Sequence, residues 1–426
     1  MKKTEPLLLR RVAKMSNPAS VEEFIALDGF QGLRKAVAMD KTKILDEISI
    51  AHLRGRGGAA YPAGRKWLHL YHIQGAPKYI VCNADEGEPG TFKDKILLEQ
   101  DPLSIIEGML IAGYVFDSPR GFIYIRGEYR PIQKIFQEAL DNATRAGFLG
   151  ENILGIPGFN YAITIVSGAG AYVCGENSAL LNSIEGRTGR PRVKPPHLAE
   201  VGLYLQPTLV NNVESFACIP AIISMGGQAF LDLGTKDGGG TKLISISGHA
   251  KNRGVFEVPL GTPMRDILYD EAYGGGTSTG KPIGFCHLGG QSGPIAFPEQ
   301  FDVLYSYQAL WDNDLALGAG ALVVMDESVS IVDYVRRVAE FFVHESCGKC
   351  TPCRVGTTRL LECLDLFVSR KATLADLERL EKLLLHITRL SACGLGQSAG
   401  VAVTSALKYR RTAFETVSSG REVALG

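Results

Sequence analysis

The stretch "HESCGKCTPCRVG" (residues 344–356) places Cys347, Cys350 and Cys353 at intervals of three residues. Three thiolates leave a four-ligand site incomplete, and the remaining candidate is Cys393, in "SACGLGQSAG". A tight loop of three cysteines with a distant fourth is typical of a [4Fe–4S] cluster bound by four thiolates. A structural zinc site is the alternative, although zinc usually takes its thiolates as two separated pairs. The spacing therefore favours an iron–sulfur cluster.

The segments around these cysteines have the periodicity of helices. "SIVDYVRRVAEFFVHES" repeats apolar residues with a period near 3.6, as a helix with one buried face does. "TLADLERLEKLLLHITRL" opens with Thr373, followed three residues later by Asp376, which resembles a capping box. These patterns predict a C-terminal four-helix bundle within residues 329–426, with helices over 330–346, 357–368, 373–390 and 398–411.

The chain upstream of the bundle has a different pattern. Apolar runs such as "KYIVCNA", "GFIYIRG" and "YAITIVSG" alternate with helical stretches such as "PLSIIEGMLIAGYVF" and "PIQKIFQEALDNATRAGF". This alternation predicts a layered α/β domain over residues 1–240. Residues 241–328 are rich in strands and contain one short helix, which favours a small β-grasp (ubiquitin-like) domain.

Composition excludes several function classes. Lysine plus arginine equals aspartate plus glutamate at 45 each, which argues against a protein that binds nucleic acid through phosphate contacts. No apolar run is long enough to span a bilayer, so we expect no direct membrane insertion. Nine cysteines, an odd number, fit a reduced cytoplasmic chain better than a disulfide framework. Cys82, Cys218 and Cys363 lie in apolar runs and are interpreted as core residues.

Two glycine-rich loops and an acidic turn carry the candidate chemistry of the first domain. "LRGRGGAAYPAGRKW" (53–67) mixes glycines with cations, as phosphate-binding loops do, but it is also compatible with a plain basic turn. "SGAGAYVCGENSAL" (167–180) leads from a strand toward a helix, whose first amides could bind an anion. "CNADEGEPGTFKD" (82–94) crowds three carboxylates, which suit ribityl or ribose hydroxyls or form a solvated acidic loop.

These stretches, with "EGRTGRPRVKPP" (185–196) and "PTLVNNVES" (207–215), resemble one family from about residue 53 to 397. It is the flavin- and NADH-binding subunit of respiratory complex I, with relatives in NAD-linked hydrogenases and formate dehydrogenases. The resemblance implies an α/β fold made of an FMN-binding α/β domain, a β-grasp domain and a helical bundle with one [4Fe–4S] cluster. It also implies FMN and NAD(H) as cofactors, which the residues alone do not identify.

The resemblance also implies roles for individual residues. Lys66 would stabilise the anionic reduced flavin, and the amides of Asn211 and Asn212 would bond phosphate or ring edges. Tyr61 and Tyr204 would stack on adenine, although Tyr204 could instead be a core residue. The expected FMN contacts are Gly55, Gly57, Lys66, Asn83, Asp85, Glu86, Tyr172, Gly175, Glu176, Asn211 and Asn212, and the expected NADH contacts are Tyr61, Glu88, Lys194 and Tyr204.

The chain departs from the family pattern in three places. Ala60 and Tyr61 stand where Gly-Phe is usual, and His69 stands where an aromatic residue often supports the adenine. Asn177 replaces a glutamate that usually follows Glu176. A second acid would repel the extra phosphate of NADPH, so the loss of this acid should reduce the preference for NADH over NADPH.

The implied reaction is hydride transfer from NADH to FMN, followed by single-electron transfer to the cluster. A non-catalytic iron–sulfur scaffold that has lost its flavin is the alternative. We expect a thioredoxin-like iron–sulfur subunit and a larger multi-cluster subunit as partners, within complex I or a soluble hydrogenase or formate dehydrogenase, bifurcating or not. We expect a cytoplasmic location, peripheral on the inner face of the membrane where partners provide the attachment.

Overall fold

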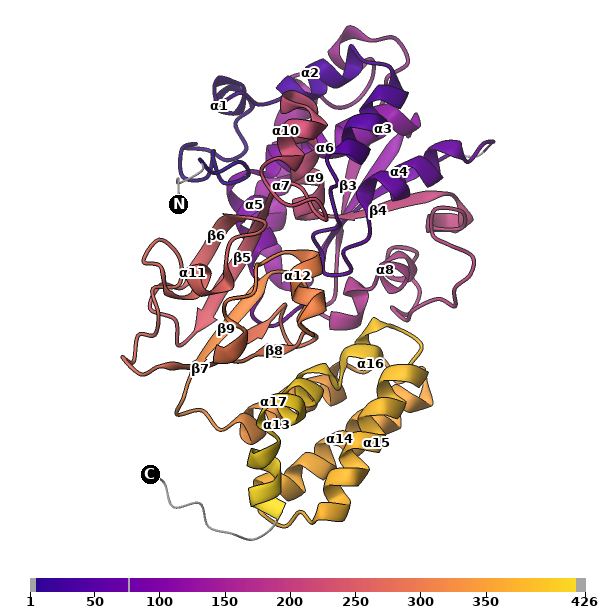
Figure 1. Ribbon diagram of the computed structural model, residues 1–426. Helices are drawn as coiled ribbons and strands as arrows, with labels where there is room; N and C mark the ends of the chain where they lie inside the picture. The colour runs from indigo at the N-terminus through magenta and orange to yellow at the C-terminus, as the bar shows by residue number, and fades with distance from the viewer. Residues whose placement is uncertain (1–4, 76, 419–426) are drawn as a thin grey trace. The chain divides into compact units, whose positions relative to one another are not determined.

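The computed structural model describes residues 5–75 and 77–418, shown in Figure 1. The chain divides into two compact units. Among the described residues, the first comprises 5–75, 77–87, 92–244 and 255–262, and the second comprises 88–91, 245–254 and 263–418. In the described part of the chain, every helix is too short or too polar to cross a membrane.

A parallel four-stranded sheet organises the first unit. Its strand order is β3-β2-β1-β4, and each neighbouring pair is parallel. Parallel strands need crossover connections, and helices supply them here. In register, Asn83 at the end of β1 lies opposite Asn212 at the end of β4. The strands are β1 (Tyr79–Ala84), β2 (Arg120–Ile125), β3 (Ala162–Ser167) and β4 (Thr208–Asn212).

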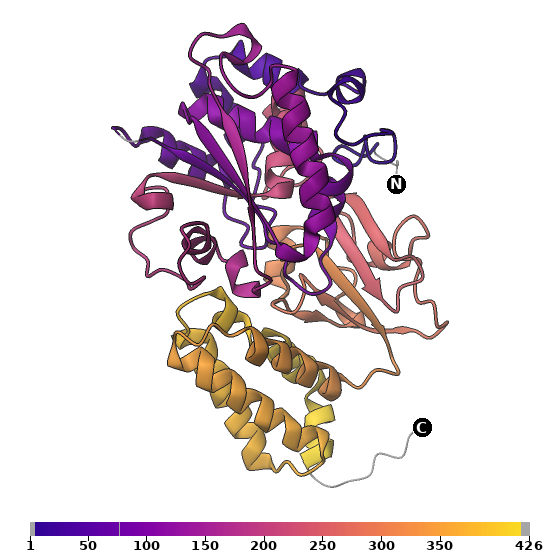
Figure 2. The ribbon, with the colours of Figure 1, turned by 180° about the vertical axis from the view of Figure 1, so that it is seen from behind.

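Helices pack against this sheet and against each other. α6 (Pro102–Phe116) is buried along nearly its whole length and packs on α9 (Val213–Met225), so the two helices form the centre of the core. α7 (Arg130–Arg145) buries one face beside β3 and is seen alongside the strands in Figure 2. The other helices of this unit are α1 (Val21–Ala26), α2 (Gln31–Val37), α3 (Lys41–Ile50), α4 (Ala63–His72), α5 (Lys93–Gln100), α8 (Asn177–Ile184) and α10 (Gly227–Leu231).

A second, mixed sheet has the strand order β6-β5-β9-β7-β8. β5 and β9 are parallel neighbours, whereas β7 is antiparallel to both β9 and β8. A parallel pair formed by the first and last strands at the centre of the sheet is the arrangement of a β-grasp fold. The elements are β5 (Thr241–Gly248), β6 (Gly254–Pro259), α11 (Met264–Tyr269), β7 (Ile283–Leu288), β8 (Ile295–Ala296), α12 (Tyr307–Asp312) and β9 (Ala321–Asp326).

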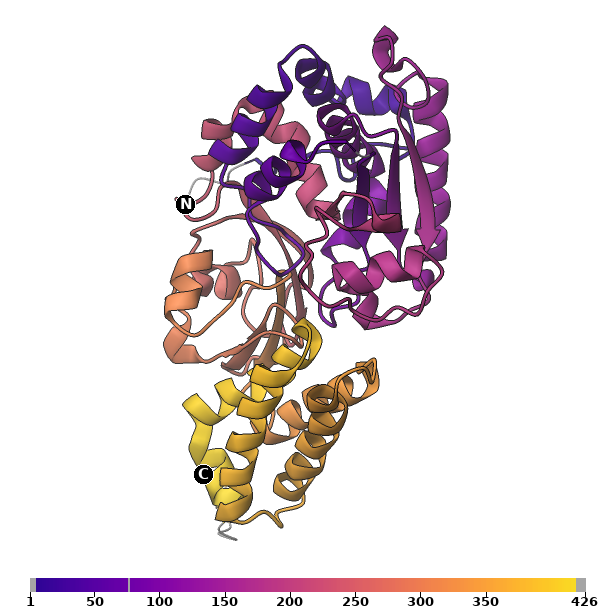
Figure 3. The ribbon, with the colours of Figure 1, turned by 90° about the vertical axis from the view of Figure 1, so that its right-hand side faces the viewer.

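The C-terminal helices form a bundle, and Figure 3 shows them lying along one another. α13 packs on α14, α14 on α15, α15 on α17 and α17 on α13, and α14 also contacts α17 across the bundle. Thr373 and Asp376 form the expected capping box at the start of α15. The helices are α13 (Ile331–Glu345), α14 (Thr351–Val368), α15 (Leu374–Leu390), the short α16 (Gly394–Ser398) and α17 (Val401–Ser418).

The mixed α/β fold with a helical C-terminal region is therefore confirmed. Cys82, Cys218 and Cys363 are buried, as expected of core residues. The division into three domains at residues 240 and 328 stays a prediction.

Candidate functional site

The carboxyl ends of β1 and β4 bring polar side chains together at one edge of the parallel sheet. Ligands of open α/β sheets bind at this edge. Asn83 donates from Nδ2 to the carbonyl oxygen of Gly175 at 2.9 Å and to Oδ1 of Asn177 at 3.2 Å. Asn83 also accepts the amide of Asp85 at 3.1 Å. One amide side chain thus joins the acidic turn to the second glycine-rich loop.

Lys66 on α4 reaches the same edge. Its Nζ donates to the carbonyl oxygen of Val210 at 2.8 Å and to Oδ1 of Asn211 at 3.2 Å. Burial lowers the pKa of Lys66 to about 8. The Nδ2 atom of Asn211 is buried and finds no hydrogen-bond partner within the described residues. A cation beside an unsatisfied amide donor is an arrangement that suits an anionic, acceptor-rich ligand such as FMN.

The first glycine-rich loop passes close to this amide pair. A Cβ atom added at Gly57 would lie 3.0 Å from Cβ of Asn212, so a side chain at this position would crowd the edge of the sheet. The loop backbone can approach the edge because Gly57 has no side chain. Gly55 donates its amide to the carbonyl oxygen of Tyr61 at 2.9 Å, which closes the loop on itself.

The second glycine-rich loop ends at α8. Glu176 caps this helix, because its Oε2 accepts the amides of Ser178 at 2.9 Å and Ala179 at 3.0 Å. Its other oxygen accepts from Nζ of Lys194 at 2.8 Å. Burial opposes ionisation, but Lys194 and Ser178 hold the pKa of Glu176 below its ordinary value. The helix amides expected to meet an external anion are therefore occupied by the protein's own carboxylate.

The acidic turn divides its carboxylates among different tasks. Glu86 is buried and caps α5, accepting the amides of Asp94 at 2.8 Å and Lys95 at 3.0 Å. Burial, reinforced by the Asp94 carboxylate, raises the pKa of Glu86 to about 7. Glu88 belongs to the other unit and accepts two hydrogen bonds from Ser292. Glu86 and Glu88 are close in the sequence, but they have different partners in the structure.

The aromatic residues expected at the adenine are exposed. Tyr61 is 52% exposed and Tyr204 is 48% exposed, so Tyr204 is not a core residue. The backbone of Tyr204 has φ = 50°, which is unusual for a bulky residue, and its amide donates to Oε1 of Glu185 at 2.8 Å. His69 lies 3.4 Å from Glu200, measured from Nε2 to Oε1.

The cysteine loop joins α13 to α14. Cys350 lies at the N-cap of α14, Cys353 is in its first turn, and Cys393 lies immediately before α16. Burial raises the pKa of the Cys353 thiol, and the neighbouring Cys350, Cys393 and Cys347 raise it further. Ser346 also lies against Cys353, with Oγ 3.3 Å from Sγ.

The donor chemistry of this loop fits a [4Fe–4S] cluster. Each of the four thiolates of such a cluster binds a different iron atom. Three cysteines around the start of α14 with a fourth before α16 suit a cluster better than zinc, which usually takes its thiolates as two separated pairs.

A buried charge network behind the sheet edge was missed by the sequence reasoning. Lys93 contacts Asp94 at 2.6 Å and Glu214 at 2.9 Å, and Glu214 also contacts Lys242 at 2.6 Å. Asp94 in turn accepts from Nδ2 of Asn212 at 2.7 Å. The one available signal was a charged residue inside each apolar run, in "NNVESFACIP" and "TKLISIS".

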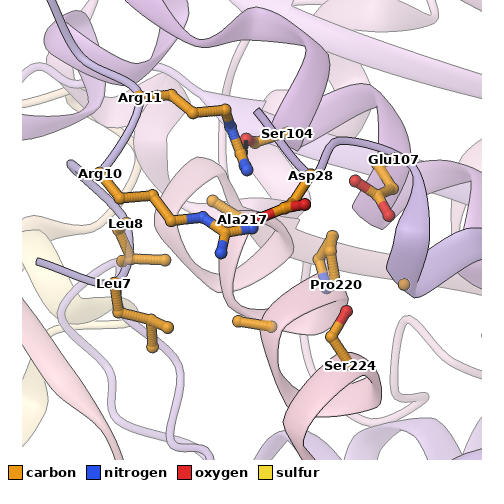
Figure 4. Close-up of a pocket in the computed structure, with 12 residues that line it drawn as sticks. Leu7, Leu8, Arg10, Arg11, Asp28, Ser104, Glu107, Ala217, Pro220 and Ser224 are labelled. Atoms are coloured by element: carbon orange, nitrogen blue, oxygen red, sulfur yellow. Dashed lines mark hydrogen bonds between the residues drawn. The ribbon is translucent and has the colours of Figure 1, made fainter. Parts of the chain in front are cut away.

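A small cavity of about 20 Å³ lies elsewhere in the first unit, and Figure 4 shows its lining. It has room for about one water molecule and contains none of the expected site residues. Glu107 lines it and accepts the amides of Phe30 at 3.1 Å and Leu33 at 2.9 Å. Burial raises the pKa of Glu107 to about 7. This cavity is too small for a nucleotide.

The sheet edge and the cysteine loop fit the expected class of protein, a flavin- and iron–sulfur-binding electron-transfer subunit, and comparisons with known proteins identify its family. Residues 48–221 match the Nuo51 FMN-binding domain, and residues 333–417 match the NADH-ubiquinone oxidoreductase-F iron-sulfur binding region. The chain belongs to the family that contains the F subunits of NADH-quinone oxidoreductases and related hydrogenase subunits. It is a flavoprotein subunit of the NADH dehydrogenase type, with FMN, NAD(H) and a [4Fe–4S] cluster as its cofactors.

Two curated relatives illustrate the range of this family. The F subunit of the NADH-quinone oxidoreductase of Streptomyces coelicolor is 44% identical, over 92% of this chain and 87% of the relative. The HndC subunit of the NADP-reducing hydrogenase of Solidesulfovibrio fructosivorans is 43% identical, over 94% of this chain and 81% of the relative. The flavin-free scaffold alternative is not favoured by these matches.

Solved structures give the same result. A chain of an NAD⁺-reducing [NiFe]-hydrogenase in the H₂-reduced state superposes with a TM-score of 0.81 at 35% identity, covering 89% of this chain. This chain spans 63% of that hydrogenase chain.

Proposed function

We propose that FMN binds at the carboxyl edge of the parallel sheet, with Lys66 and Asn211 as its central contacts. The observation that carries this proposal is the buried Nδ2 donor of Asn211, which has no partner in the described part of the chain although Lys66 holds its Oδ1. Leaving such a donor unsatisfied costs roughly 1–3 kcal/mol, which a flavin acceptor would recover. The close approach of the loop at Gly57 supports the same position.

NADH would meet the residues that the resemblance assigns to it. Tyr61 and Tyr204 are sufficiently exposed to stack on an adenine. Lys194 is held by Glu176 but remains half-exposed, so it can also contact a pyrophosphate. Glu88 would accept ribose hydroxyls.

Bound FMN supplies hydride acceptance and one-electron release, so the residues need only orient the reactants. Lys66 would place positive charge beside the reduced ring, and Cys347, Cys350, Cys353 and Cys393 would hold the iron atoms. No side chain has to move a proton in the hydride step.

The protein would work inside a larger assembly. Its relatives are named as subunits of quinone oxidoreductases and hydrogenases. A thioredoxin-like iron–sulfur subunit and a larger multi-cluster subunit would receive the electrons, within complex I or a hydrogenase or formate dehydrogenase. We propose a cytoplasmic location, with any membrane attachment made through these partners.

The site assignment is tested by replacing Asn211 with leucine, which removes the amide but approximates its size. We expect FMN, released by acid and measured by fluorescence, to fall at least about tenfold while the iron content stays full. The control is Gln137→Leu, because Gln137 is an exposed amide that bonds Asp141 on α7. Full FMN content in Asn211→Leu would contradict the proposed position.

A further inference from the structure

Glu88 lies in a cradle formed by the loop that follows β7. The amide of Ser292 donates to Oε1 of Glu88 at 3.0 Å, and the Ser292 hydroxyl donates to Oε2 at 2.8 Å. Gly290 has φ = 93°, and a Cβ atom added there would lie 2.3 Å from Cγ of Glu88. The loop therefore contacts both the oxygens and the stem of this side chain.

The loop is anchored at its far end by a buried histidine. His287 on β7 is fully buried and contacts the carbonyl oxygen of Gly293 through Nε2 at 3.0 Å. A carbonyl can only accept, so Nε2 carries the hydrogen. Burial lowers the pKa of His287 to about 4, so Nδ1 is unprotonated near neutral pH and accepts from the hydroxyl of Tyr334 on α13, at 3.0 Å.

The same loop contains a second polar side chain, that of Gln291. Oε1 of Gln291 is buried, and among the described residues it has no hydrogen-bond partner. Unsatisfied buried acceptors are uncommon, and a donor on a bound molecule is one way in which this acceptor can be satisfied.

We propose that Ser292 and Gly290 are positioning residues for the nicotinamide nucleotide, because they hold the Glu88 carboxylate in place for the ribose hydroxyls. This inference rests on the proposed role of Glu88. A carboxylate can accept about four hydrogen bonds, so bonding to Ser292 is compatible with a ribose donor. An unrestrained glutamate would lose side-chain entropy when it bonds a ribose, and the cradle removes part of that cost in advance.

The test measures NAD⁺ binding to the oxidised, FMN-loaded protein by isothermal titration calorimetry, where no turnover occurs. Ser292→Ala should raise the Kd of NAD⁺ by about three- to tenfold and raise the KM for NADH by a similar factor, with a smaller effect on kcat. Ser292→Thr retains the hydroxyl and should restore the affinity. Gly290→Ala should weaken binding at least as much as Ser292→Ala.

A double-mutant cycle separates a positioning role from a general structural one. Because Ser292 acts through Glu88, the double variant Ser292→Ala/Glu88→Gln should bind NAD⁺ no more weakly than Glu88→Gln alone. Ser278→Ala, an exposed serine of the same unit that bonds the carbonyl oxygen of His249, is the control and should match the wild type. FMN and iron contents report whether each variant is folded.

The outcomes are distinguishable. If Glu88→Gln weakens NAD⁺ binding and Ser292→Ala does not, the positioning role is wrong and the role of Glu88 stands. If Glu88→Gln leaves the affinity unchanged, the assignment of Glu88 fails and the inference fails with it. Additive effects in the double variant would also overturn the proposal.

Discussion

At the scale of single residues, the position of Lys66 at the sheet edge predicts how the affinity for FMN depends on pH. Its pKa of about 8 is lowered by burial, so the side chain is charged below pH 8 and becomes neutral above it. If this charge attracts FMN, the affinity of the flavin-depleted protein for FMN should fall as the pH rises above about 8. A bound anion would stabilise the charged form of Lys66 and so raise its pKa in the complex.

The comparison is with Lys66→Met, which keeps the aliphatic stem. We expect this variant to bind FMN about tenfold more weakly at pH 7. Its affinity for FMN should also no longer fall as the pH rises above about 8. Fluorescence titration between pH 6 and 10 measures both. An unchanged pH profile in Lys66→Met would show that another group causes the decline.

Asn177 carries a prediction about nucleotide selectivity. Its Oδ1 accepts from Asn83 at 3.2 Å, next to the Glu176–Lys194 pair. Asn177→Glu would restore a negative charge that repels the 2′-phosphate of NADPH, so the ratio of kcat/KM for NADH to that for NADPH should rise by roughly three- to tenfold. Asn177→Gln is the neutral control. Equal ratios in the wild type and Asn177→Glu would contradict the role of this position.

Individual residues also show where sequence reasoning succeeds and where it stops. Four cysteine ligands, which here remain a prediction, can be proposed from the sequence because a cluster constrains the identity and spacing of its ligands directly. The partners of Glu86 and Glu88 cannot, because one carboxylate caps a following helix and the other meets a serine 204 positions away. The sequence also did not predict the exposure of Tyr204, because an aromatic residue between apolar neighbours is equally compatible with a place in the core.

At the scale of elements, a variant in the cysteine loop between α13 and α14 should distinguish FMN reduction by NADH from electron transfer beyond the flavin. Cys350→Ser removes one thiolate and should lower the iron content and the paramagnetic-resonance signal of the reduced cluster. FMN reduction by NADH should remain, because the match to the FMN-binding domain covers residues 48–221, which do not include the cysteine loop. Electron transfer beyond the flavin should be lost.

Cys363→Ala provides the control for this loop, since Cys363 is a buried core cysteine of α14 whose thiol contacts the carbonyl oxygen of Asp376 at 3.7 Å. It should keep full iron. A complete cluster signal in Cys350→Ser would refute the ligand assignment.

The capping box of α15 offers a test of local stability. The hydroxyl of Thr373 accepts the amide of Asp376 at 3.3 Å, and Asp376 accepts the amide of Thr373 at 2.9 Å. Thr373→Ala should destabilise the start of the helix by about 1 kcal/mol, which corresponds to about fivefold faster hydrogen exchange in its first turn. Thr404→Ala, within α17, removes an exposed hydroxyl that caps no helix and should leave α15 unchanged.

Whole elements were easier to predict than their contacts. α6 and α15 match the apolar runs that predicted them, because periodicity is a local property. The chain Asn212–Asp94–Lys93–Glu214–Lys242 joins separate segments, so only the folded structure shows it. Asp94 and Glu214 hold the pKa of Lys93 well above its ordinary value despite the opposing effect of burial. Breaking such a buried pair typically costs about 3–5 kcal/mol.

At the scale of the whole molecule, the cofactors of this family determine which reactions the isolated chain can perform. FMN accepts hydride from NADH, and a [4Fe–4S] cluster passes single electrons, so the purified chain should reduce an artificial one-electron acceptor such as ferricyanide with NADH. Splitting of dihydrogen and oxidation of formate require a metal centre of another kind, and reduction of a membrane-embedded quinone requires a binding site that reaches into the bilayer. We therefore expect none of these three when the chain is assayed alone.

The assay compares NADH oxidation with each acceptor or donor, before and after removal of FMN. Loss of ferricyanide reduction on flavin removal, and its return on adding FMN, would show that electrons pass through the flavin. The native complex, purified from the source cell through this subunit, should regain one of the three missing reactions, and that reaction identifies the partner. Turnover of hydrogen, formate or quinone by the isolated chain would contradict its role as one subunit of a larger complex.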